Sequence, residues 1–215
     1  MSIRIYTSWD DGNKLDIRMA QLLKQYDLPG IFFIPNSEAH CDITLEEIRY
    51  LVSEGFEIGG HTKTHYPDMK RLSIEKQTEE IVFNKGWLEG LIGRKLEWFC
   101  YPHGRYDDNT VRIVKDAGYK YARTTVVDTI YNVKSYDELG SDRFRIRTAA
   151  HVYQSKKYGK LDWLERAKFL FLKAKETDAI YHIFGHSWEV NSIGEFGLWK
   201  ELEELFKFIN DNKNV

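Results

Sequence analysis

Short apolar runs alternate with amphipathic stretches along most of the chain. Runs such as 30–34 and 179–185 are apolar at almost every position, as is typical of strands buried on both faces of a sheet. The stretch 161–174 instead has apolar residues at helical spacing. By these criteria, strands are predicted at residues 3–7, 30–34, 56–60, 98–101, 119–127, 144–147 and 179–185.

Helices are predicted in most of the intervals between those strands. Thr44 is a favourable N-cap residue, Glu46 and Glu47 follow in the first turn, and Gly55 ends the same helix. Strand and helix alternate about seven times, which indicates a parallel sheet covered by helices. Residues 128–142 are polar and irregular. The predicted helices cover residues 15–27, 44–55, 73–91, 107–118, 161–174 and 195–209.

Two architectures share this alternation, an open doubly wound sheet and a closed barrel. The glycine signature of a dinucleotide site is absent after the first strand, which weakens the open-sheet interpretation. The candidate polar residues follow different strands, at the ends where barrel active sites are built. We therefore predict a barrel. No linker, repeat or low-complexity segment interrupts the pattern, which predicts a single domain over residues 1–215.

Composition narrows the function classes. The formal net charge of −2 favours neither nucleic acid nor an anionic membrane surface as a partner. No apolar run approaches the roughly 20 residues that span a bilayer, and no signal-peptide pattern opens the chain. Cys41 and Cys100 are too few for a disulfide framework. A cytoplasmic location is therefore expected, with a trimmed secreted form as the alternative.

Asp10 and Asp11, followed by Gly12, come shortly after the first predicted strand. A buried carboxylate is costly unless a cation or hydrogen bonds compensate it, so this is an unusual strand ending. Neighbouring strand residues point to opposite faces, but at a strand end both can reach one pocket. One metal ligand and one base suits the pair better than the paired acid and base of a glycosidase. A turn that caps the next helix is the structural alternative.

His61 and His65 follow the third predicted strand. Their spacing predicts a helical turn with both imidazoles on one face, and Gly59 and Gly60 allow a close backbone approach before them. Imidazole and carboxylate groups bind zinc and similar divalent ions, and three protein ligands leave a position for water. Together with Asp11, the two histidines form a candidate metal site; two surface histidines at this spacing are the alternative.

Two further strand ends carry candidate chemistry. The tight turn around His103 follows the strand at 98–101, and its backbone N–H groups can face a developing oxyanion, although an ordinary turn is the alternative. His186 follows the last strand, where a histidine can donate a proton to a leaving group. His182 is interpreted as a packed histidine. No role is assigned to His40 or His151.

Together these motifs resemble those of the polysaccharide deacetylase family, the NodB homology domain. Residues 8–12 resemble its first motif and residues 61–65 its second, and this pair is specific in combination. Residues 101–104 resemble the third motif more loosely, as the last strand with its ending at 186–189 resembles the fifth. That ending is also similar to a gellan-lyase-associated subgroup. The resemblance extends over residues 3–190.

The resemblance implies a deformed (β/α)7 barrel that hydrolyses an N-linked or O-linked acetyl group of a carbohydrate. It also implies one divalent metal ion, zinc with cobalt or nickel as alternatives, which activates the attacking water. By motif position, the general base is Asp10, the general acid is His186, and the metal ligands are Asp11, His61 and His65. Substrate or oxyanion contacts are implied for Tyr101, His103, Arg123 and Trp188.

Three positions depart from the family pattern. The arginine that orients the base is expected two residues before the third-motif proline, where this chain has Cys100. Arg123, at the end of the next predicted strand, is a candidate substitute. The fourth motif, which supports the acid histidine, has only Asp128 as a candidate. The proline expected after Gly12 is replaced by Asn13.

Two other functions fit the same fold. A non-catalytic carbohydrate-binding or scaffold domain would explain the missing arginine at position 100. A metal-independent hydrolase of cyclic amides would have lost a metal ligand, and none is missing from this sequence. Metal content distinguishes both from a metal-dependent deacetylase.

Overall fold

The computed structural model describes residues 3–37, 41–153, 162–192 and 198–214. Within this part of the chain, parallel strands form a seven-stranded sheet in the order β5-β4-β3-β2-β1-β7-β6. β1 lies between β2 and β7, so the first strand of the chain pairs directly with the last one. The strands are β1 (Arg4–Asp10), β2 (Ile31–Ile34), β3 (Glu57–Gly60), β4 (Trp98–Cys100), β5 (Tyr121–Arg123), β6 (Ala150–His151) and β7 (Ile180–Gly185).

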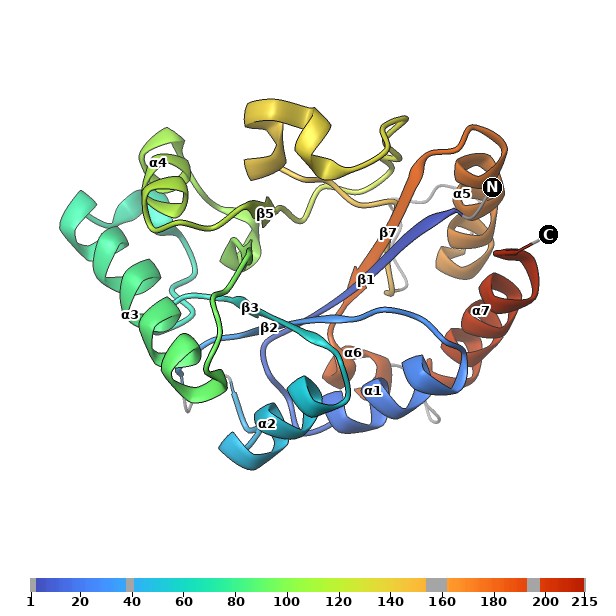
Figure 1. Cartoon of the computed structure of the whole chain (residues 1–215), viewed down its shortest axis with the longest axis horizontal. Helices are drawn as coiled ribbons and strands as arrows, with labels where there is room; N and C mark the ends of the chain where they lie inside the picture. The colour runs from blue at the N-terminus through green and yellow to red at the C-terminus, as the bar shows by residue number, and fades with distance from the viewer. Residues whose placement is uncertain (1–2, 38–40, 154–161, 193–197, 215) are drawn as a thin grey trace.

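The sheet curls into the predicted deformed barrel, with helices outside it (Figure 1). A short segment between β5 and β6 completes the curl. Ile146 forms a parallel bridge with Arg123 of β5, and three residues later the N–H of Ala149 donates to the carbonyl of His182 in β7 (2.6 Å). The segment changes its partner too quickly for a regular ladder. The prediction of a strand at 144–147 is therefore wrong, and only a single bridge forms there.

Helices connect the strands and cover the outside of the sheet (Figure 1). They are α1 (Asp16–Gln25), α2 (Leu45–Ser53), α3 (Ile74–Ile92), α4 (Asp108–Asp116), α5 (Trp163–Glu176), α6 (Ser187–Ser192) and α7 (Trp199–Asn212), with short 3-10 helices at Met69–Arg71, Pro102–Gly104 and Tyr136–Phe144. Thr44 caps α2 as predicted: its hydroxyl accepts from the Glu47 N–H (3.2 Å), and the Glu47 carboxylate accepts from the Thr44 N–H (2.7 Å). The helix α6 was not expected from the sequence. The predicted helix starts at 161 and 195 lie outside the described residues.

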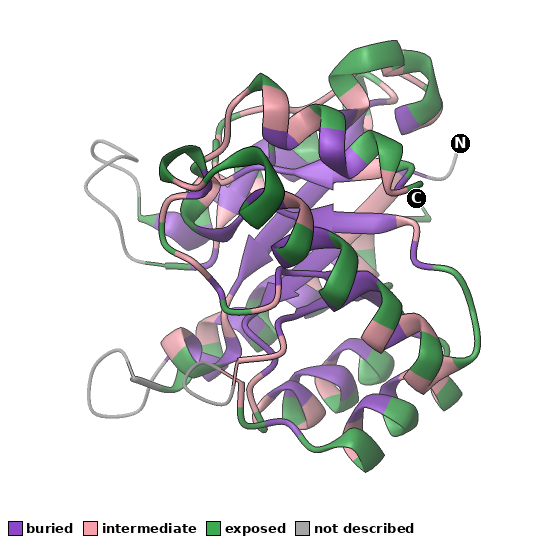
Figure 2. Cartoon of the chain, turned by 90° about the vertical axis from the view of Figure 1, so that its left-hand side faces the viewer, coloured by how far each residue is buried: buried purple, intermediate pink, exposed green. Residues whose placement is uncertain are grey.

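Most of the sheet is buried, while the helices expose their outer faces (Figure 2). Trp9 of β1 is fully buried and packs edge-on against Phe206 of α7, with ring centroids 6.3 Å apart. On the inner face, Ser8 Oγ lies 3.0 Å from the Nε2 of His182, whose Nδ1 lies 2.9 Å from the Tyr136 hydroxyl. His182 is thus a packed histidine, as expected. A small apolar cluster fills the barrel beneath the strand ends: Ile31, Phe33, Trp98, Cys100, Tyr136, Ile146 and Ile180.

The sequence contains no apolar run long enough to span a bilayer, and the helices of the structure can be compared with that expectation. Among the residues that the structure describes, no helix combines the length and the apolar character that crossing a membrane requires.

Candidate active site

A pocket of about 440 Å³ opens at the carboxyl ends of the strands. It is lined by all the sequence-predicted site residues except Tyr101 and Arg123. The gathering follows from topology, because the carboxyl ends of parallel strands meet at the same edge of a sheet. Residues far apart in the sequence therefore share one cavity.

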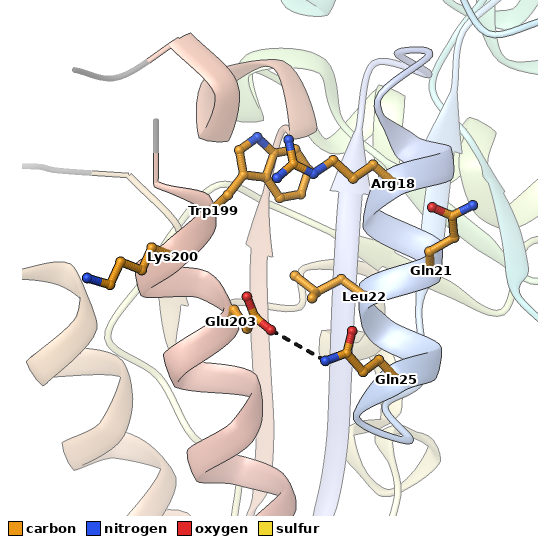
Figure 3. A pocket seen from close by; sticks show the side chains of 7 residues that line it. All are labelled: Arg18, Gln21, Leu22, Gln25, Trp199, Lys200 and Glu203. Atoms are coloured by element: carbon orange, nitrogen blue, oxygen red, sulfur yellow. Dashed lines mark hydrogen bonds between the residues drawn. The ribbon is translucent and has the colours of Figure 1, made fainter. Parts of the chain in front are cut away.

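A second hollow, of about 460 Å³, lies between α1 and α7 (Figure 3). There the Arg18 guanidinium lies 4.1 Å from the centre of the Trp199 ring, and Gln25 donates to Glu203 (3.4 Å). These contacts link α1 and α7 where the two helices pack side by side. The first pocket is the better candidate for chemistry because it gathers carboxylates and imidazoles.

Asp11, His61 and His65 bring three potential ligand atoms within 4.8 Å of one another. Asp11 Oδ1 lies 3.4 Å from His61 Nε2 and 3.1 Å from His65 Nε2. His61 Nδ1 lies 2.9 Å from the Cys100 carbonyl oxygen, which can only accept, so Nδ1 carries a proton. Nε2 is then the ring nitrogen that faces the Asp11 carboxylate, on the side where His65 Nε2 also lies. This donor set therefore fits a divalent metal ion.

The loop from His61 to His65 is not the helical turn that the spacing predicted. Thr62 and His65 have φ angles of 67° and 54°, in a region that costs a residue other than glycine about 1–3 kcal/mol. Buried Glu80 of α3 holds the loop, since its two carboxylate oxygens accept from the N–H and the hydroxyl of Thr64, both at 2.7 Å. A tertiary contact therefore holds the loop that brings the two imidazole centres to 4.8 Å.

Asp10 is buried and forms an ion pair with Arg123, which is also fully buried. Arg123 lies beside Cys100 in the register of β5 and β4, and its Nη2 donates to the Cys100 sulfur (2.9 Å). The guanidinium also lies 4.4 Å from the ring of Phe184. Burial alone would raise the pKa of Asp10, but the charges of Arg123, His61 and His186 together with the Arg123 hydrogen bond hold that pKa below its usual range. The carboxylate is thus ionised at neutral pH.

His186 follows β7 and faces both aspartates. Its Nε2 lies 3.8 Å from Asp10 Oδ2 and 3.9 Å from Asp11 Oδ2. Its Nδ1 lies 2.5 Å from Glu189 Oε2, and the same oxygen lies 2.8 Å from His151 Nε2. Burial lowers the pKa of His186, but the hydrogen bond with Glu189 and the charges of the aspartates raise it to about 9. The ring is therefore protonated at neutral pH, as a general acid must be.

The sequence model of the polysaccharide deacetylase family matches residues 2–122, more than half of the chain. The chain belongs to the polysaccharide deacetylase family. The Bacillus subtilis (strain 168) protein YxkH, which carries a polysaccharide deacetylase name, is 27% identical over 124 residues. These residues cover 56% of this chain and 44% of YxkH, so the chain spans less than half of that relative.

Solved structures of polysaccharide deacetylases share the fold over nearly the whole chain. The peptidoglycan deacetylase PdaC from Bacillus subtilis is 16% identical, with a TM-score of 0.63, and the match covers 99% of this chain and 85% of PdaC. A family 4 carbohydrate esterase from Streptomyces lividans, in complex with acetate, is 14% identical with a TM-score of 0.63, over 97% and 86% of the two chains. The deformed (β/α)7 barrel expected from the resemblance is confirmed.

Two residues beside His186 escaped sequence reasoning. Glu189 lies three residues after His186, and that spacing was a usable signal, because such residues share one face of a helix. His151 lies far away in the sequence, and no local pattern marks it. Asp128, the sequence candidate for supporting His186, instead forms an ion pair with Arg166 (2.8 Å).

Three further residues were predicted to contact the substrate or the oxyanion: Tyr101, His103 and Trp188. Tyr101 is fully buried, its hydroxyl donates to the Phe144 carbonyl (3.0 Å), and its N–H donates to the Arg123 carbonyl (3.2 Å). Both polar groups are engaged inside the fold, and Tyr101 is not among the residues that line the pocket, so its contact with substrate stays a prediction. His103 lines the pocket at a φ of 53°. Trp188 is 41% exposed, and its indole N–H donates to Asp11 Oδ2 (3.0 Å).

Proposed function

We propose that this protein is a metal-dependent hydrolase that removes an N-linked or O-linked acetyl group from a carbohydrate. One observation carries the proposal: the Asp10 carboxylate, a three-ligand donor set and the His186 imidazole share one pocket, with His186 Nε2 at 3.8 Å from Asp10 and 3.9 Å from Asp11. A base, a Lewis acid and an acid are the groups that hydrolysis of an acetyl group needs. The names of the relatives add support, since PdaC is a peptidoglycan deacetylase.

Asp11, His61 and His65 would hold the metal ion, which we propose to be zinc, with cobalt or nickel as alternatives. Two imidazoles and a carboxylate form a known catalytic zinc set. When bound, the ion supplies a Lewis acid for the acetyl carbonyl and lowers the pKa of a water molecule. The Trp188 N–H on Asp11 and the Cys100 carbonyl on His61 orient two of these ligands from behind.

We assign Asp10 as the general base that accepts a proton from the attacking water. Its ion pair with Arg123 keeps it ionised and fixes its orientation. Arg123 thereby takes the role of the family arginine that is missing at position 100. It reaches Asp10 from β5, the strand next to the one that carries Cys100. The backbone N–H of the turn at His103, whose ring centre lies 5.0 Å from that of His65, would stabilise the oxyanion.

We assign His186 as the general acid. Its Nδ1–H is directed to Glu189, so its Nε2–H faces the pocket. The Nε2 proton can then be transferred to the leaving nitrogen or oxygen. The acetyl carbon gains the oxygen of water and loses its bond to the sugar substituent, which gives acetate and a free amine or alcohol. The half-exposed ring of Trp188 at the rim suits contact with a sugar face.

Acetate release tests this function. The metal-loaded protein is incubated with N-acetylated chitin and peptidoglycan fragments and with O-acetylated xylan oligosaccharides. Asp10→Asn should abolish release with metal content unchanged, whereas His61→Ala should lose both metal and activity. Asp116→Asn, on an exposed face of α4, is the matched control and should retain activity. A protein that binds one metal ion but releases no acetate from any of these substrates would refute the proposal.

The alternatives have less support. The non-catalytic carbohydrate-binding domain rested on the missing arginine, and the Arg123–Asp10 ion pair removes that argument. A metal-independent hydrolase of cyclic amides should lack a metal ligand, whereas Asp11, His61 and His65 cluster within 4.8 Å.

A further inference from the structure

One oxygen of Glu189 binds two histidines from different elements. Oε2 lies 2.5 Å from the Nδ1 of His186, which follows β7, and 2.8 Å from the Nε2 of His151 in β6. A carboxylate oxygen only accepts, so both nitrogens carry protons. Burial would raise the pKa of Glu189, but the hydrogen bonds from the two histidines lower it to about 2. Glu189 is therefore an anion shared by two N–H donors.

These distances indicate hydrogen bonds and not a second metal site. Ligands at about 2.0–2.2 Å from one tetrahedral ion lie roughly 3.3–3.6 Å from each other. The nitrogen–oxygen distances of 2.5 and 2.8 Å are shorter than that and match charge-assisted hydrogen bonds. The cluster of His151, His186 and Glu189 is thus a hydrogen-bonded triad.

His151 is a rigid anchor for the shared carboxylate. Its ring stacks on that of Phe184, with centroids 4.3 Å apart and an interplanar angle of 10°. Its backbone is paired with Phe184 in the ladder between β6 and β7. A glutamate side chain has three rotatable bonds, and a single hydrogen bond would let it pivot. Two donors from different directions leave the carboxylate of Glu189 one orientation.

We propose that Glu189 and His151 are positioning residues for the acid: Glu189 orients His186, and His151 fixes Glu189. The inference rests on the proposed function in one respect, the role of His186 as acid. With Nδ1–H held by Glu189, the imidazole can turn only its Nε2–H toward Asp10 and Asp11. Within the four residues 186–189, the chain supplies the acid and its carboxylate partner, and β6 supplies the anchor.

Two substrates that differ in leaving group test the proposal. An N-acetylated oligosaccharide needs a protonated leaving group, whereas p-nitrophenyl acetate releases a stable phenolate that does not. Glu189→Gln should lower kcat for the amide by about 10²-fold, at the low end of the effect of proton transfer. KM, metal content and ester hydrolysis should stay within about 3-fold of the wild type, because proton transfer to the phenolate contributes little.

His151→Phe keeps a flat ring on Phe184 and removes the N–H donor, so amide kcat should fall by about 10-fold, less than for Glu189→Gln. Glu176→Gln, exposed at the end of α5, makes the same chemical change away from the pocket and should have no effect. In a His186→Ala background, Glu189→Gln should cause no further loss, because it acts only through His186. Equal losses for both substrates, or an additive loss in the double variant, would overturn the proposal.

Failure of the proposed function would look different, because the metal-loaded wild type would then hydrolyse neither substrate. In that case ¹⁵N NMR of the histidine rings decides the inference. The wild type should show a protonated Nδ1 in His186 and a protonated Nε2 in His151. Glu189→Gln should alter both rings and leave buried His182 unchanged. Unaltered signals from His151 or His186 in that variant would refute the shared carboxylate.

Discussion

The ion pair of Asp10 and Arg123 stabilises the fold only while both partners are present. Both side chains lie almost wholly out of water, with exposed fractions of 4% and 0%. A charge buried without its partner pays the full desolvation penalty, while a well-placed pair offsets much of it. The same pair that orients the proposed base is thus a point of structural vulnerability.

Arg123→Met should lower the free energy of unfolding by about 3–5 kcal/mol, because it leaves Asp10 buried without its cation. Arg49→Met, which breaks an exposed pair with Glu46 (3.9 Å), should lower it by less than about 1 kcal/mol. Denaturant unfolding measures both. Acetate release should fall in Arg123→Met and recover in part when Cys100→Arg is added, since the Cys100 sulfur lies 3.6 Å from Asp10 Oδ2. Equal losses of stability in the two variants would contradict the burial argument.

The pH dependence of amide hydrolysis should report His186. Burial lowers the pKa of this ring, but Glu189, Asp10 and Asp11 raise it to about 9. A cation at Asp11 would lower the pKa of His186 again, so about 9 is its upper limit. As pH rises through this pKa, the Nε2 proton is lost and the rate should fall. His186→Ala should remove this alkaline limb and lower the rate about 10²–10⁴-fold. An unchanged limb in the pH–rate profile of the variant would assign it to another group.

The sequence predicted the candidate site residues better than it predicted the side chains that hydrogen-bond to them. The motifs predicted Asp10, Asp11, His61, His65 and His186 as site residues, because the chemistry needs carboxylates and imidazoles at strand ends, and the structure brings them into one pocket. Their partners were harder to predict. A hydrogen bond from another strand, such as that of His151, depends on the folded sheet and leaves no local pattern in the sequence.

At the scale of elements, the loop after β3 shows where periodicity fails. A spacing of four predicts a shared helical face only if the backbone is helical. Here Thr62 and His65 adopt positive φ, and Glu80 of α3 binds Thr64 in that conformation. The strand predicted at 144–147 failed for a related reason, because Ile146 pairs with β5 whereas Ala149, three residues later, already donates to His182 of β7.

Glu80→Ala should therefore weaken metal binding by about 10–100-fold, as loss of a residue that orients ligands typically does. The adjacent Glu79 is the matched control, since it also contacts the loop, but through an exposed ion pair with Lys63 (2.7 Å). Glu79→Ala should change affinity by less than about 5-fold. Titration with zinc under competition from a chelator measures both. Similar losses in the two variants would show that burial of Glu80 is not what holds the loop.

At the scale of the whole molecule, the barrel was predictable and its closure was not. Alternating strands and helices restrict the topology to a few parallel arrangements, and polar residues at strand ends favoured the barrel among them. Closure instead depends on Ile146 and Ala149, which bind strands distant in sequence. Such pairings depend on the shape of the completed sheet.

The proposed metal site ties together parts of the chain that separate on unfolding. Asp11 follows β1, and His61 and His65 follow β3, with β2 between those strands in the sheet. An ion that binds only the folded protein stabilises it by about 2.7 kcal/mol at a free concentration of 100 times Kd. For a chain of this size, removal of the ion by a chelator should lower Tm by roughly 5–11 °C.

The double variant His61→Ala, His65→Ala locates the ion responsible for that shift. With two of three ligands gone, Tm should be the same with and without metal, because the folded state no longer binds the ion more tightly than the unfolded chain. Glu176→Gln, exposed on α5, should keep the full metal-dependent shift. Calorimetry of the metal-loaded and chelator-treated proteins measures these differences. A shift that persists in the double variant would place the stabilising ion away from the carboxyl ends of β1 and β3, and the metal role assigned to this pocket would fall with it.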